Sequence, residues 1–213
     1  MKTTRTIIIL AALAMAFGFA TQASAQALSG SKHDFSATGA LGLGQGLLGA
    51  GDNMCSVCHA PHSKAAYYIQ DAPLANHTKT DVATGYTLYT AGSSTISATL
   101  TAPAGSDVLC LSCHDGSIAI DAYGGGAGTA TMSGAALLTK DMQNDHPTSI
   151  DYATLSATTD PDFNTQAAVE ATNLVLYGGI VRCATCHNVH NPGTEGKFLR
   201  MTKATLCQAC HTK

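Results

Sequence analysis

The sequence predicts an irregular fold that is mostly coil, with short helices and one small β-hairpin. Three observations predict it. Periodic apolar patterns are sparse, and Trp is absent. Glycine-rich stretches at residues 41–51 and 124–128 are typical of loops. A short motif, C-x-x-C-H, occurs four times and uses all 8 cysteines of the 213-residue chain. A chain with so few large apolar side chains needs another source of apolar core.

The repeated motif indicates covalent attachment of c-type haem. Two thiols three positions apart lie on one helical turn and both reach the vinyl groups of a porphyrin, and the next residue, His, lies under the iron as the proximal ligand. The copies are Cys55/Cys58 with His59, Cys110/Cys113 with His114, Cys183/Cys186 with His187, and Cys207/Cys210 with His211. We therefore expect four covalently bound haem c groups with their iron, each motif on a short helix. The expected fold is a multihaem cytochrome c, a polypeptide wrapped around four stacked haems.

Three other uses of paired cysteines fit less well. Zinc sites contain C-x-x-C pairs but do not require His directly after each second Cys. A thioredoxin-like redox motif occurs once, beside a βαβ pattern. A disulfide scaffold is compatible with a secreted chain but does not explain four identically placed histidines.

The N-terminus is typical of an exported protein. Lys2 and Arg5 precede an uncharged apolar run at residues 7–20, and Ala23-Ser24-Ala25 is a small-residue cleavage site. We predict a secretory signal peptide at residues 1–25 and a single tetrahaem domain at residues 26–213. The mature protein is expected to be secreted, either extracellular or at the cell surface, with the periplasm as the alternative.

Charge and hydropathy exclude two classes of partner. The formal net charge is −3, only 12% of residues are charged, and no Lys/Arg run is present. We therefore expect no nucleic-acid partner. The run at residues 7–20 is too short to span a bilayer well, and no other apolar stretch approaches that length, so we expect no membrane span.

The chain carries a weak internal duplication. Residues 55–62 and 183–190 both read C-x-x-C-H-x-x-H, and each unit is followed by an L-C-x-x-C-H unit, at residues 109–114 and 206–211. The first pair of motifs is separated by the insert at residues 63–108, whereas the second pair is tight. Residues 173–183 predict a β-hairpin with Gly178-Gly179 at its turn. Residues 151–171 allow one helix.

Five histidines remain after the four proximal ligands are assigned, and four irons need a sixth ligand. His33, His62, His146 and His190 are the expected distal ligands. His77 is a possible distal ligand but the least favoured. Met54, Met132, Met142 and Met201 are alternative ligands that the surplus of His makes unnecessary.

The positions of His62 and His190 restrict what they can bind. Each lies three residues after a proximal His, and residues i and i+3 of a helical turn share one face. Such a side chain lies on the proximal side of its own haem, so we expect it to ligate a different haem. His146 precedes Pro147, which favours an extended backbone that holds the imidazole outward.

The pattern as a whole resembles a known family. Ser31-Lys32-His33-Asp34, residues 55–62, residues 110–116, Asp145-His146-Pro147, residues 183–190 and residues 206–211 resemble the doubled-CxxCH multihaem cytochromes c of anaerobic, metal-respiring microbes. Small secreted tetrahaem members of that group are similar to subunits of extracellular cytochrome filaments. The resemblance implies a continuous chain of stacked haems in which one His of each subunit ligates a haem of the next.

Two classes of function follow. Four haems with two His ligands each leave no open iron position, so the protein is expected to be an electron carrier without catalytic residues rather than an enzyme. Its partners are then redox proteins or extracellular electron acceptors. The alternative is a multihaem reductase, which needs one haem with an open position. A sequence cannot separate a free carrier from an electron-transfer subunit of a larger complex.

Among carriers, a head-to-tail filament and a monomeric periplasmic shuttle are both open. A ligand offered across a subunit boundary makes a head-to-tail contact, and such a contact builds a filament if it does not close. His62 is the first choice of donor, with haem 1 lying against haem 4 of the adjoining copy, and His33 is the second.

Overall fold

The computed structural model describes residues 28–36, 54–62, 65–70, 72, 74–90, 98, 100–155, 160–191 and 196–213. The expected signal peptide at residues 1–25 and the glycine-rich stretch at residues 41–51 lie outside the described residues.

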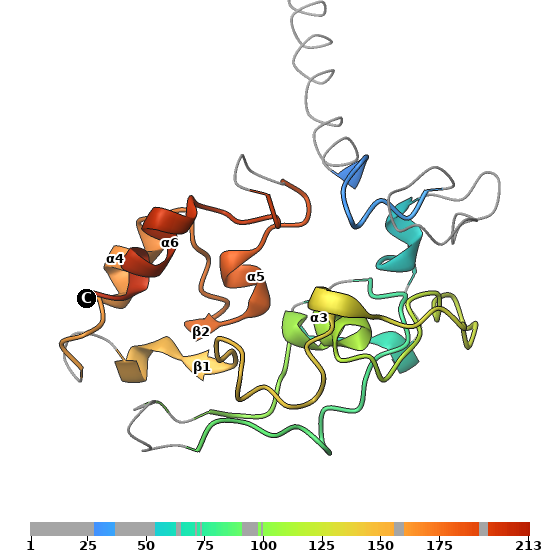
Figure 1. Ribbon diagram of the computed structural model, residues 1–213, viewed down its shortest axis with the longest axis horizontal. Helices are drawn as coiled ribbons and strands as arrows, with labels where there is room; N and C mark the ends of the chain where they lie inside the picture. Colours follow the sequence, from blue (N-terminus) through green and yellow to red (C-terminus); the bar gives the residue numbers. More distant parts are fainter. Residues whose placement is uncertain are drawn as a thin grey trace, which may run out of the picture.

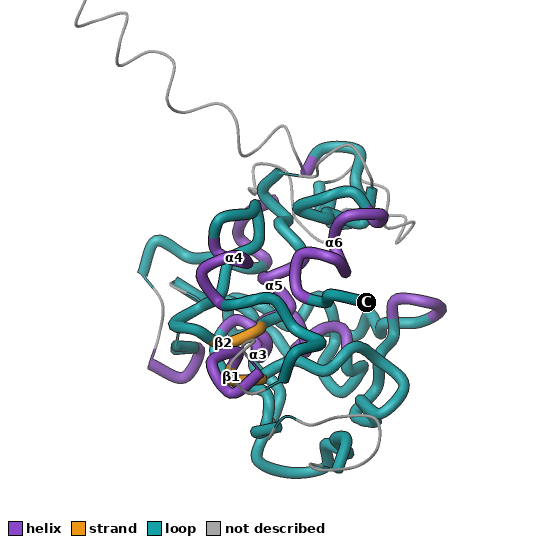
Figure 2. The backbone as a smooth tube through the Cα atoms, turned by 90° about the vertical axis from the view of Figure 1, so that its left-hand side faces the viewer, coloured by secondary structure: helices purple, strands orange, loops and turns teal. Residues whose placement is uncertain are grey.

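Loops dominate the described chain, as the sequence predicts. Figure 2 shows short helices and very short strands connected by long irregular segments. The helices are η1 (Met54–Val57), η2 (Ala65–Tyr67), α3 (Ser106–His114), η3 (Gly134–Ala136), η4 (Tyr152–Leu155), α4 (Gln166–Glu170), α5 (Cys183–Cys186) and α6 (Lys203–Cys210). None of the described helices is both long and apolar enough to cross a membrane. The expectation of mostly coil with short helices is confirmed.

The two strands form one small antiparallel sheet. β1 (Ile150–Asp151) pairs with β2 (Ile180–Val181), with Ile150 opposite Val181. Gly178 and Gly179 both have positive φ, 63° and 83°, as a type I′ turn requires. The backbones of Tyr177 and Ile180 bond each other across this turn. The predicted turn is therefore confirmed, but the hairpin ends after this bridge because β2 pairs with β1.

The side-chain core is divided into three small groups. The largest, which we name the C-terminal cluster, lies around β1, β2, α4 and α6. Its buried members are Ala98, Ile150, Tyr152, Leu155, Val169, Leu174, Leu176 and Val181. A second group contains Phe35, Val57 and Ile120, and a third contains Ile69, Ala72, Ala75 and Val108. No single core holds the described chain together. Each group instead packs against a different C-x-x-C-H segment, through Cys58, Leu109 and Cys210 respectively for the second, third and largest group.

Two helix pairs bring distant segments together. α4 lies beside α6, and α3 lies beside α5 (Figure 1). α4 begins at Thr165, whose hydroxyl accepts a hydrogen bond from the backbone N–H of Ala168. The stretch at residues 151–171, in which one helix was expected, contains η4 and α4. Because α3 and α5 carry the second and third motifs, their contact places those two motifs side by side.

Candidate functional site

All four C-x-x-C-H motifs lie on short helices, as the sequence predicts. The first motif begins within η1, the second ends α3, the third forms α5 and the fourth ends α6. The backbone N–H of His59, His187 and His211 bonds the carbonyl of the first cysteine of its own motif, at 2.8, 3.1 and 2.9 Å. This bond closes one turn, so that each imidazole has a fixed position relative to the two thiols before it.

Three proximal histidines are held from outside the helix as well. The chain leaves the helix at His59, His187 and His211 and forms isolated antiparallel bridges with Ala75, Leu199 and Phe163. His187 and His211 have extended backbone, with φ of −108° and −98°. The fourth, His114, is the last residue of α3. Each of the four proximal residues is therefore anchored by backbone bonds.

Cysteine thiols of different motifs are neighbours. The pKa of Cys183 is raised well above its ordinary value, first by a hydrogen bond with Cys110 and then by burial. Burial raises the pKa of Cys58 to about 12, and the nearby Cys110 thiol adds to the rise. Burial likewise raises the pKa of Cys186 to about 11, with Cys210 as the next cause. None of the eight cysteines, all of which lie in the described part of the chain, forms a disulfide. Thiol groups of the first three motifs thus lie together, and those of the third and fourth lie together.

Three imidazoles are oriented by backbone carbonyls. The Nδ1 atoms of His114 and His187 lie 2.8 Å from the carbonyl oxygens of Ala136 and Lys197. The Nδ1 atom of His146 lies 3.0 Å from the carbonyl oxygen of its neighbour, Pro147. A carbonyl accepts, so Nδ1 carries the proton and donates, which leaves Nε2 as the free lone pair. This is the arrangement usual for a metal-binding His.

The structure brings proximal and expected distal histidines together in three pairs. The ring centroids of His33 and His114 are 6.0 Å apart, those of His59 and His190 are 6.0 Å apart, and those of His146 and His211 are 6.4 Å apart. A metal about 2 Å from a nitrogen of each ring gives a centroid separation of roughly 6 Å. The spacing of each pair therefore fits one iron between two imidazoles.

In each pair the pKa of one imidazole is lowered, which favours the neutral form that binds a metal. Burial, and then the neighbouring His114 and His187, lower the pKa of His33 to about 4. Burial, and then His59, lower the pKa of His190. Burial and His146 lower the pKa of His211, against an opposing effect of Asp162.

His33 has one further feature that fits a metal. Its Nδ1 atom is buried and has no hydrogen-bond partner within the described part of the chain. Its ring packs between Phe35 and Phe198, with centroids 6.0 and 5.0 Å away. A buried polar atom without a partner is costly, and an iron bond would remove that cost. The residues around the motifs therefore fit haem c.

His77 is not in such a pair. It is 1% exposed. Its Nδ1 atom lies 2.7 Å from the carbonyl oxygen of Thr78, and its Nε2 atom lies 3.1 Å from the carbonyl oxygens of both Ala119 and Ile120. Nε2 also lies 3.4 Å from the Cys113 sulfur. Protein atoms cover both ring nitrogens, so His77 is not open to an iron and instead joins the segment after the first motif to the segment after the second.

Two exposed histidines stand apart from the pairs. His62 and His187 each expose their side chains, and neither has a ring partner at the spacing of the three pairs among the residues that the structure describes. His187 approaches His33 closely enough to lower the pKa of that imidazole. The third motif is therefore the one whose proximal His lacks a matched imidazole in the described chain.

The four candidate methionines pack rather than point at a pair. Met54 and Met132 lie against the group formed by Phe35, Val57 and Ile120. Met201 lies against the C-terminal cluster, and Met142 is 5% exposed. Among the described residues no three His, Cys, Asp or Glu side chains are grouped to hold one metal ion.

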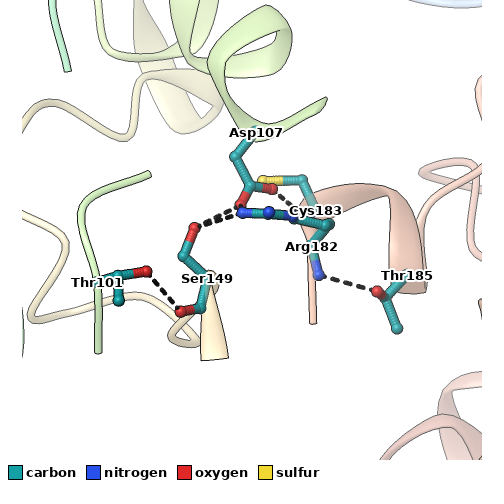
Figure 3. Close-up of polar contacts among 6 residues, drawn as sticks. All are labelled: Thr101, Asp107, Ser149, Arg182, Cys183 and Thr185. Atoms are coloured by element: carbon teal, nitrogen blue, oxygen red, sulfur yellow. Dashed lines mark hydrogen bonds and ion pairs between the residues drawn. The ribbon is translucent and has the colours of Figure 1, made fainter. Parts of the chain in front are cut away.

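A buried polar network joins the second and third motifs, and sequence reasoning missed it. Asp107, on α3, is 0% exposed and lies 3.5 Å from Arg182, the residue before α5. The Ser149 hydroxyl donates to Asp107 at 2.9 Å, and Arg182 donates to Ser149 at 2.9 Å. Figure 3 shows these side chains meeting between the two helices. The sequence did contain a sign of this network. In a chain with few charges, one charged residue lies one turn before Cys110 and another lies directly before Cys183.

A second network holds the residue after His114. The Asp115 carboxylate accepts hydrogen bonds from the hydroxyls of Thr80, at 2.6 Å, and Tyr86, at 2.5 Å, and from the backbone N–H of Ser117, at 2.7 Å. Burial alone would raise the pKa of Asp115, but these hydrogen bonds outweigh it and the pKa is lowered. The network ties the insert to the end of α3.

Comparison with known proteins agrees with this site. Residues 178–213, which contain the third and fourth motifs, match the family model for the doubled CXXCH motif. No curated protein matches the chain. The doubled motif indicates covalently bound haem c and electron transfer. The match supports a place for the chain among the multihaem c-type cytochromes.

Proposed function

We propose that the protein is a secreted tetrahaem c-type cytochrome that conducts electrons through closely packed haems with two His ligands each. The observation that carries this proposal is the set of three imidazole pairs at 6.0–6.4 Å, each joining a motif His to a distant His. Haem iron supplies the electron-carrying couple, ferric to ferrous. Two imidazoles per iron leave no position for a substrate, which favours electron transfer over catalysis.

We propose three of the ligand sets from the proximity of the imidazoles. His190 serves the haem of Cys55/Cys58 opposite His59, His33 serves the haem of Cys110/Cys113 opposite His114, and His146 serves the haem of Cys207/Cys210 opposite His211. The neighbouring thiols of Cys110 and Cys183 bring two attachment points together. Attachment points this close favour short electron-transfer steps between haems.

For the third haem we propose a ligand from another copy of the chain. His187 and His62 are both exposed. The internal duplication supports this pair, because His190 follows His187 by three residues and lies opposite His59, and His62 follows His59 by the same spacing. The sequence favoured haem 4 as the acceptor, but His211 already has His146 beside it. His33, the second choice of donor, is half-buried and lies next to His114 of the same chain.

A ligand donated in this way makes a head-to-tail contact, and repetition of that contact gives a filament. We propose that the filament is extracellular and serves anaerobic respiration, passing electrons to acceptors outside the cell. The predicted signal peptide and the resemblance to filament-forming cytochromes support this assignment. In an isolated chain, the iron bound by His187 would have an open coordination position. A reductase therefore remains the second candidate.

The test is the variant His62→Ala, with Gln143→Ala, an exposed loop residue, as the control. Negative-stain microscopy should show filaments for the wild type and the control, and monomers for His62→Ala. Ferrous wild type should not bind carbon monoxide, whereas His62→Ala should bind one equivalent. Wild-type monomers with every iron six-coordinate would instead establish the periplasmic shuttle. Wild-type monomers that bind one equivalent would establish the reductase.

A further inference from the structure

We propose that Asp107 and Arg182 form a charge-balanced clamp between the second and third haem sites, which keeps the net effect of these two buried charges on the reduction potentials of both haems small. The inference rests on the proposed function, since it requires haems at Cys110/Cys113 and Cys183/Cys186. It assigns to two residues outside the C-x-x-C-H motifs a role in tuning the electron path.

The clamp joins the two attachment helices directly. One carboxylate oxygen of Asp107 accepts the backbone N–H of Cys183 at 2.6 Å, and the other accepts the Ser149 hydroxyl and lies 3.5 Å from an Arg182 nitrogen. Asp107 itself lies one helical turn before Cys110. A single carboxylate therefore contacts the first residue of the third motif from the helix that carries the second.

The local backbone of Arg182 fixes its side of the clamp. The backbone N–H of Arg182 donates to the Thr185 hydroxyl at 2.9 Å. The guanidinium of Arg182 donates to the hydroxyl of Ser149, a residue with a φ of 58°. The Thr101 hydroxyl donates to the backbone carbonyl of Ser149 at 3.1 Å (Figure 3). Residues of three segments therefore hold the clamp in place: Thr101 in the insert, Ser149 directly before β1, and Thr185 in α5.

Burial makes the charge balance matter. The side chains of Asp107 and Arg182 are 0% and 10% exposed, so water screens neither charge well. A buried pair with both partners present is nearly neutral to its surroundings, whereas removal of one partner leaves an uncompensated charge. The carboxylate and guanidinium lie between two attachment motifs, so a lone charge there acts on both haems.

The direction of each effect follows from the charge of the iron. A ferric haem carries one more positive charge than a ferrous haem, and nearby charge is one of the levers that set haem potential. A lone Arg182 disfavours the ferric state and raises the potential. A lone Asp107 stabilises the ferric state and lowers it. The two charges together largely cancel, so the complete pair shifts the potential of either haem little.

The experiment uses Asp107→Asn, Arg182→Gln, the double variant and Arg182→Lys, with Asp151→Asn as the control. Asp151 is exposed, and its change removes the same charge as Asp107→Asn. Intact mass first counts the covalent haems of each purified chain. Spectroelectrochemical titration of the full-length protein then measures the four midpoint potentials.

The expected result is a set of shifts of opposite sign. Asp107→Asn should move two of the four midpoint potentials upward, and Arg182→Gln should move two downward. The double variant and Arg182→Lys should both have midpoint potentials close to those of the wild type. The control should move none. The clamp would be overturned if the protein carries four haems but the two single variants shift the midpoint potentials in the same direction or do not shift them. The proposed function would then remain intact. A wild-type mass without four haems would instead overturn the proposed function. If Asp107→Asn does not fold, the comparison of Arg182→Gln with Arg182→Lys tests the clamp. Loss of the positive charge should lower two midpoint potentials, and its retention should not.

Discussion

The imidazole rings of His59 and His190 are nearly parallel, with centroids 6.0 Å apart and planes at 24°, although His59 belongs to the first motif and His190 follows the third. His190 lies three residues after His187 and therefore stands next to one attachment motif while it faces the proximal His of another. If His190 ligates the haem of the first motif, as we propose, the first and third haem sites depend on each other.

We expect His190→Ala to open the first haem rather than the third. The variant should bind one equivalent of carbon monoxide in the ferrous state, because a five-coordinate iron is left opposite His59. In a chain that also carries Cys55→Ala and Cys58→Ala, and so lacks the first haem, the additional change at His190 should create no carbon monoxide site. A site that persists there would place His190 on a different iron.

His146→Ala should open the fourth haem, because His146 lies beside His211. His146 is exposed, so the loss of its side chain should cost little folding stability. Electron paramagnetic resonance should show one new high-spin ferric signal without loss of haem from the chain. An unchanged low-spin spectrum would mean that another residue supplies that ligand.

His77→Ala should affect stability and leave iron coordination unchanged. The change removes a buried ring and its contacts with the carbonyls of Ala119 and Ile120, of which Ala119 keeps the backbone N–H of Ala122 as a donor. We expect the free energy of unfolding to fall by roughly 2–4 kcal/mol. Chemical denaturation measures this loss, with the exposed Lys79→Ala as control, while the optical spectrum should remain that of six-coordinate haem. A high-spin signal in His77→Ala would show that the residue is a ligand after all.

Acid should loosen the loop anchored by Asp121. Its carboxylate accepts the backbone N–H groups of Thr129 and Ala130 at 2.7 and 2.8 Å. Burial acts to raise the pKa of Asp121, but these bonds outweigh it and the pKa is lowered. A lowered carboxylate pKa gives stability that is complete above the ordinary value of about 4 and is lost as the pH falls through the folded value.

Thermal unfolding of the wild type and Asp121→Asn measures this contribution across pH. The wild type should be the more stable of the two at neutral pH, and the difference should disappear on acidification below pH about 4. A difference independent of pH would show that the amide substitutes fully for the carboxylate or that the loop does not contribute.

Covalent load is the most direct check on the sites as a whole. The mature chain should exceed the polypeptide mass by four haems after acid extraction. Replacement of Cys207 and Cys210 by Ala should reduce that excess to three. A mass that matches zinc or disulfides would contradict the haem assignment.

Local features of the fold were predictable from the sequence because they depend on neighbouring residues. The helical turn at each motif follows from the spacing of its cysteines, and the turn at Gly178-Gly179 follows from the need for positive φ at both positions. The five candidate distal histidines were found by subtraction from the motif set. Which of them stands near which motif depends on contacts across the chain, and spacing does not determine those contacts.

The missed features share that dependence on long-range contact. Strand 180–181 pairs with Ile150–Asp151 rather than extending the local hairpin. His77 reads as a polar loop residue between Asn76 and Thr78, yet the segment around Ile120 covers it. Nothing in the local sequence of Asp107 or Arg182 indicates that the other is its partner. The two residues form a buried ion pair only because α3 and α5 lie side by side in the fold.

The bridges at His59, His187 and His211 bear on ligand exchange. If an iron–imidazole bond breaks, the ring cannot diffuse away, because Ala75, Leu199 and Phe163 hold the backbone beside it. The ring then returns at a high effective concentration, and a competing small molecule must act within the brief opening. We expect cyanide and imidazole added from solution to displace these proximal ligands far more slowly than they fill a site from which a distal ring has been removed by mutation.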